Sequence, residues 1–141
     1  VAMETTDVYR KMIVDEINFV AKKMTKAQSA SEKLFYFSAV FGILHRILNI
    51  EYDSDLVFSQ FVIMATHDAL LNRLKAIQQG WDNTVTLSDD QFEKLTTLTK
   101  ELAKKIHKNE DVIDTLKKFV TLTYSTSGNG FYLMQRGSLK I

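Results

Sequence analysis

His67 and Asp68 are the residues of this chain whose types and spacing first suggest chemistry. They stand side by side in FVIMATHDALLNRLKA, residues 61–76, where the apolar residues follow helical spacing. An imidazole and a carboxylate are both metal ligands in proteins, so the doublet can supply two ligands to one ion. The same doublet can equally be two polar residues on a helix surface, and both interpretations remain open from the sequence.

A His-Asp doublet on a helix resembles the metal-binding doublet of the His-Asp (HD) metal-dependent phosphohydrolases, which are all-α proteins. The resemblance implies an earlier ligand, His45, and a later one, Asp111 or Asp114. Such a set would hold a metal ion that lowers the pKa of a bound water for attack on a phosphoester. In that family a glycine usually follows the doublet near a helix end, whereas here the helical pattern continues through ALLNRLKAI.

Each histidine also has a structural explanation that needs no ligand. His45 lies where its helix changes from apolar to polar, and His107 lies in a lysine-rich helix end where positive charge is favourable. The chain has no Glu three residues before a His, and no HExxH, P-loop, GxGxxG or GxSxG motif. These observations favour a protein that is not an enzyme and that binds no cofactor.

Length and composition indicate one ordinary globular domain. The 141 residues are 45% hydrophobic and 25% charged, with a net charge of +1 that gives no reason to expect nucleic-acid binding. The absence of cysteine excludes disulfides and thiolate metal sites, and the absence of proline suits long helices. The longest apolar run, residues 34–44, is shorter than the roughly 20 residues that a membrane span needs. We expect a soluble, cytoplasmic protein.

Apolar residues recur at helical spacing in five stretches, which predict helices over about 7–26, 32–50, 55–79, 89–108 and 110–123. The S-x-x-E sequence from Ser29 to Glu32 is a capping box that marks the second start. The fold class is therefore all-α, a single bundle over residues 1–141 with a non-helical or hairpin tail at 124–141. The second and third helices are apolar nearly all round, so we expect them to form a central antiparallel hairpin.

The remaining polar residues are typical of solvated helix faces. Three acid-then-base pairs at i,i+4 predict surface ion pairs, and three threonines in the fourth helix look like surface residues (Asp90/Lys94, Glu101/Lys105, Asp114/Lys118; Thr96, Thr97, Thr99).

With no catalytic constellation, the sequence favours a non-enzymatic helical interaction or assembly module that acts through protein–protein contacts, including self-association. The second and third helices carry more phenylalanine than one antiparallel seam can bury, so the rest is either covered by other helices or exposed (Phe35, Phe37, Phe41, Phe58, Phe61). Beyond the Gly128–Gly130 turn signal, four consecutive residues are the predicted partner-binding segment (Phe131, Tyr132, Leu133, Met134). The alternatives are a His-Asp type phosphohydrolase and an apolar-ligand-binding bundle.

Overall fold

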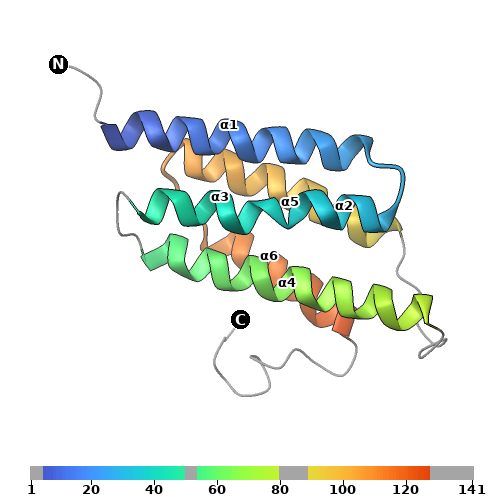
Figure 1. The fold of residues 1–141 in the computed structure, drawn as a ribbon. Coiled ribbons are helices and arrows are strands. Elements are labelled where there is room, and N and C mark those ends of the chain that lie inside the picture. Colours follow the sequence, from blue (N-terminus) through green and yellow to red (C-terminus); the bar gives the residue numbers. More distant parts are fainter. Residues whose placement is uncertain (1–4, 50–53, 80–88, 128–141) are drawn as a thin grey trace.

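The predicted all-α bundle is confirmed by the computed structural model, which describes residues 5–49, 54–79 and 89–127. Within these ranges the chain forms six helices and no strand (Figure 1). They are α1 (Thr5–Lys26), α2 (Ala30–Phe37), α3 (Ala39–Leu48), α4 (Ser54–Gln78), α5 (Asp89–His107) and α6 (Ile113–Ser127). Since α2 and α3 follow one another along nearly one line, the helices make five rods, as the sequence predicted.

Ser38 divides the predicted second helix into α2 and α3. Its hydroxyl donates to the carbonyl of Phe35, while its N–H still donates to the carbonyl of Leu34 at 3.0 Å. A side-chain bond of this kind competes with the helical backbone pattern and bends helices. The start of α2 follows the capping box, because the Ser29 hydroxyl accepts from the N–H of Glu32 at 3.1 Å.

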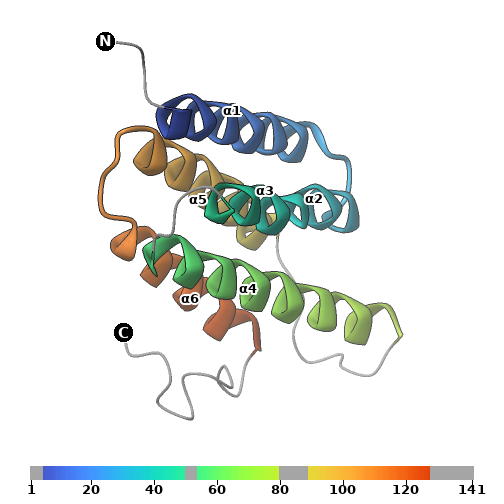
Figure 2. The same ribbon diagram turned by 60° about the vertical axis from the view of Figure 1, so that its left-hand side comes forward.

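The five rods form a ring in which each rod packs on its two neighbours, and α2 also contacts α5 across the ring (Figures 1 and 2). Helix α1 packs on α5, α5 on α6, α6 on α4, α4 on α3 and α2, and these two return to α1. The expected hairpin partners do lie side by side and run in opposite directions, but they are members of the ring and are not enclosed by it. Every rod therefore keeps an outer side that faces away from the core.

The core fills the inside of this ring. Phe37 of α2, Phe92 of α5 and Phe119 of α6 are fully buried, and the rings of Phe37 and Phe119 have centroids 6.1 Å apart. Aliphatic side chains from α1, α3, α4 and α5 complete the same cluster (Ile13, Ile17, Met24, Leu44, Ile63, Leu70, Leu95, Leu102). These apolar residues recur at helical spacing and so form buried stripes, which hold the rods together.

Hydroxyl groups are built into this interior. Thr96 and Thr99, which the sequence placed on the surface, are buried in α5, whereas Thr97 is exposed. The prediction was wrong for the first two because a threonine hydroxyl can donate to the helix carbonyl four residues earlier. Thr96 does so to Phe92 at 3.0 Å and Thr99 to Leu95 at 2.8 Å, which removes the cost of burying the hydroxyl.

Helix α6 begins and ends later than the predicted range of 110–123. It starts at Ile113 because the Asp111 carboxylate accepts from the N–H of that residue at 2.9 Å, and Asn109 before it has a positive φ of 56°. Residues 124–127, which the sequence assigned to the non-helical or hairpin tail, are helical, so this part of the prediction was wrong. In this Ser- and Thr-rich end, four hydroxyls are paired with helix carbonyls three or four residues earlier, so the helix does not leave them without a partner (Thr121, Thr123, Ser125, Thr126).

No helix in the described ranges is both long and apolar enough to cross a bilayer.

Candidate functional site

The His67–Asp68 doublet lies on α4 as a contact between neighbouring side chains. The His67 Nδ1 and the Asp68 Oδ1 are 3.2 Å apart, and the side chains are 24% and 61% exposed. The imidazole is partly covered by the bundle while the carboxylate projects to solvent. The two groups can form one hydrogen bond. Together they supply only two ligands for a metal ion, so other residues would have to supply the remaining ligands.

The other residues of the metal hypothesis serve different purposes. The ring of His45 stacks on Phe41, with centroids 6.4 Å apart and planes 8° from parallel. Asp111 caps the start of α6, as described above, and Asp114 is exposed in its first turn. In the part of the chain that the structure describes, which includes all of these residues, no three His, Asp or Glu side chains gather in a group that could hold a metal ion. The doublet is thus not joined by His45 or Asp111.

The predicted partner-binding residues Phe131, Tyr132, Leu133 and Met134 lie outside the described residues, so this assignment stays a prediction.

Large apolar side chains are exposed on α2 and α4, two helices that pack on each other. Phe35 is 71% exposed, Phe61 58% and Met64 41%. Of the five phenylalanines that the sequence singled out, only Phe37 is fully buried, while Phe41 and Phe58 are half-buried against the core. The sequence left open whether these rings are covered or exposed, and Phe35 and Phe61 are exposed.

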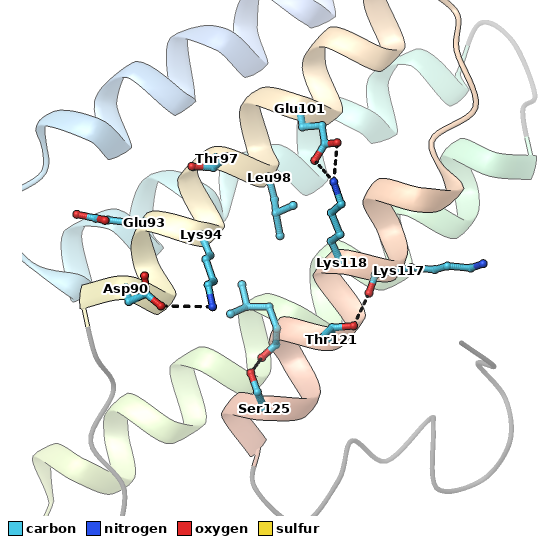
Figure 3. Close-up of a pocket in the computed structure, with 11 residues that line it drawn as sticks. Asp90, Glu93, Lys94, Thr97, Leu98, Glu101, Lys117, Lys118, Thr121 and Ser125 are labelled. Atoms are coloured by element: carbon cyan, nitrogen blue, oxygen red, sulfur yellow. Dashed lines mark hydrogen bonds and ion pairs between the residues drawn. The ribbon is translucent and has the colours of Figure 1, made fainter.

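A groove of about 590 Å³ separates α5 from α6 over part of their length (Figure 3). Leu98 and Leu122 supply its apolar lining, and charged and hydroxyl side chains surround them (Asp90, Glu93, Lys94, Thr97, Glu101, Lys117, Lys118, Thr121, Ser125). The volume is within the usual range for a small-ligand site, which is about 300–1,000 Å³.

The charged residues of this groove are largely paired. Lys118 Nζ of α6 lies 3.0 Å from Glu101 Oε1 of α5, and Lys94 Nζ lies 3.3 Å from Asp90 Oδ2 one turn before it (Figure 3). The Asp90–Lys94 pair confirms one predicted i,i+4 contact. Lys118 pairs with Glu101 across the groove, where the sequence had predicted Asp114 as its partner. Because the groove carries three acidic and three basic side chains, it offers no net charge to select a ligand.

Comparisons of the chain with protein-family models, with curated protein sequences and with solved structures found no match in any of the three.

Proposed function

We propose that this chain is a non-enzymatic helical module that acts through protein–protein contacts, with a second copy of itself as the partner. The observation that carries the proposal is the 71% exposure of Phe35 on the outer side of α2. Full burial of a large apolar side chain contributes about 1.5–3 kcal/mol. An aromatic ring in this position therefore favours any contact that covers it.

The side chains that surround Phe35 on the outer side of the rod are uncharged and small. Four small residues are exposed at the spacing of one helix side, one turn before Phe35 and up to two turns after it (Ser31; Ser38, Ala39, Gly42). A Cβ placed on Gly42 would meet nothing within 4 Å. Because these side chains are small, there is open space over the rod one to two helical turns from the Phe35 ring.

The two charged residues in this stretch of α2 are engaged at the turn between α1 and α2. The Glu32 carboxylate accepts from the N–H of Gln28 at 3.0 Å, and the Lys33 ammonium donates to the carbonyl of Met24 at 2.9 Å. Neither charge needs to be stripped of water when a second apolar surface covers Phe35. This lowers the desolvation cost of the proposed contact.

The rod carries an aromatic ring on one half and small residues on the other half. A two-fold rotation brings the ring of one copy onto the small residues of a second copy, so this surface can pair with itself. If two copies place their α2–α3 rods antiparallel, Phe35 of each copy faces the Ser38–Gly42 stretch of the other. Isologous contacts of this kind are the commonest way in which soluble chains associate. Phe61 and Met64 on the neighbouring α4 extend the apolar area that such a dimer could cover.

Sedimentation velocity of the full chain over a range of concentrations tests the proposal. The unmodified chain is expected to show a concentration-dependent dimer that the Phe35→Ser variant loses. Phe19→Ser is the matched control, because Phe19 is an equally large ring that is 61% exposed on a different helix, α1. A chain that remains monomeric throughout, or a dimer that both variants weaken equally, would contradict the proposal.

A further inference from the structure

The outer side of α1 carries a second row of exposed apolar side chains. Val8, Met12 and Phe19 are 43%, 47% and 61% exposed, and their spacing of four and seven residues places them in one line along the helix. Ile13 and Ile17, on the opposite side of the same helix, are fully buried. The row therefore points away from the core and takes no part in holding the bundle together.

Four lysines flank this row. Lys11, Lys22, Lys23 and Lys26 are all exposed, and the Lys23 ammonium lies 5.5 Å from the centre of the Phe19 ring. In the described part of the chain, no carboxylate lies within ion-pair distance of these four ammonium groups.

Among the side chains that the structure describes in α1, a single acidic one, that of Asp15, is exposed on the same side. Four lysines against one aspartate give this side a charge of +3, while the whole chain carries only +1. The positive charge is thus concentrated beside the exposed apolar row, where it can act together with Phe19.

The shape of this side is a ridge. Helix α1 packs on α5, α2 and α3, and it lies at the edge of the bundle in both views (Figures 1 and 2). A partner helix seats in a groove between elements, whereas a single convex helix with lysines on either side of an apolar row can lie on a flat surface. Lysine stems extend from such a row to the level of lipid phosphates while the apolar groups enter below them.

We propose that the outer side of α1 binds an anionic lipid surface, with the ring of Phe19 entering the headgroup region and Lys11, Lys22, Lys23 and Lys26 contacting lipid phosphates. This contact is peripheral and is separate from the α2 surface of the proposed dimer. Each lysine close to an anionic surface contributes roughly a fivefold gain in affinity. Binding is expected to weaken with ionic strength, because salt screens exposed charges.

Co-sedimentation with vesicles tests this directly. The full chain is incubated with vesicles of phosphatidylcholine alone or of phosphatidylcholine and phosphatidylserine at four to one. We expect binding to the anionic vesicles, and at least a roughly tenfold loss for Lys22→Glu/Lys23→Glu, in which two attractive charges become repulsive. Phe19→Ser is expected to weaken binding as well, and Phe35→Ser to leave it unchanged.

The matched charge control is Lys100→Glu/Lys104→Glu, which makes the same change in net charge on exposed positions of α5. Equal losses in the two double variants would show binding by net charge alone and would overturn the proposal. So would equal binding to neutral and anionic vesicles, or no binding to either. If the chain does not bind vesicles but binds polyglutamate, and the Lys22→Glu/Lys23→Glu variant loses that binding, the surface recognises an acidic protein and the lipid assignment is wrong. Circular dichroism establishes that each variant is folded.

Discussion

Phe35 and Phe37 stand two residues apart on α2 and face opposite ways. Phe37 is fully buried with its ring against Phe119, whereas Phe35 is 71% exposed. Their residue type and helix are the same, so the difference comes from the ring of rods, which covers only one side of α2. The two phenylalanines of α2 therefore have different environments, one in the core and one at the surface.

The two phenylalanines are expected to respond differently to truncation. Phe37→Ala removes a core ring and leaves a cavity, which we expect to cost about 3–5 kcal/mol in the free energy of unfolding. Phe35→Ala is expected to change that free energy by no more than about 0.5 kcal/mol. Urea denaturation at low protein concentration measures both. A large loss for Phe35→Ala would mean that its ring packs within its own chain.

The buried contact between Thr66 of α4 and Thr123 of α6 permits a test of coupling across the bundle. Their hydroxyl oxygens are 2.8 Å apart, and each hydroxyl also lies within bonding distance of its own helix carbonyl, at Val62 and Phe119. The two hydroxyl protons are therefore shared among three hydrogen-bond contacts. We expect each single Thr→Val change to cost about 1 kcal/mol, and the double change to cost less than the two added together. Strictly additive values would show that the hydroxyls do not interact.

The His67–Asp68 doublet is expected to be a polar feature of the α4 surface. Elemental analysis of untagged, undialysed protein should then find no stoichiometric transition metal in either the unmodified chain or the His67→Ala variant, because no third ligand joins the doublet in the described residues. A stoichiometric metal that is lost in His67→Ala would revive the phosphohydrolase hypothesis, and hydrolysis of phosphoesters would be assayed next.

The ion pair between Lys118 and Glu101 joins the two walls of the α5–α6 groove, but it is expected to stabilise the bundle only slightly. Its side chains are 58% and 28% exposed, so water and salt screen the attraction. We expect Glu101→Gln to cost less than about 1 kcal/mol in thermal or urea unfolding, and less still at high ionic strength. A larger cost that persists in high salt would show that the pair is shielded from solvent.

Much of the fold could be predicted because its causes are local. Apolar spacing identified five rods, and the Ser29–Glu32 capping box identified the start of α2. The late end of α6 was missed because Ser and Thr usually indicate a turn, whereas here their hydroxyls bond back to the helix. The same back-bonding explains why Thr96 and Thr99 could be buried.

The surfaces were harder to predict because they depend on how the rods are arranged. The apolar content of α2 and α3 suggested a central position, yet a ring of five rods leaves the side with Phe35 open. In α1, the helical spacing of Ile17, Val20 and Met24 indicates the buried side, whereas Val8 and Met12 are exposed although their spacing also suggests that side. The metal hypothesis rested on the order of the residues in the sequence. In the structure, His45 stacks on Phe41 and Asp111 caps the start of α6.

Gly42→Leu tests the proposed self-association most directly. In a single copy, the added side chain has open space at its Cβ, and leucine favours helix by roughly 0.8 kcal/mol over glycine, so the fold should become more stable. In the proposed dimer, the same side chain would occupy the place of the second copy's Phe35. Sedimentation equilibrium of the unmodified chain and of the variant, with thermal unfolding beside it, is therefore expected to show a dimer that becomes a more stable monomer. A variant that dimerises as tightly as the unmodified chain, or an unmodified chain that never dimerises, would contradict it.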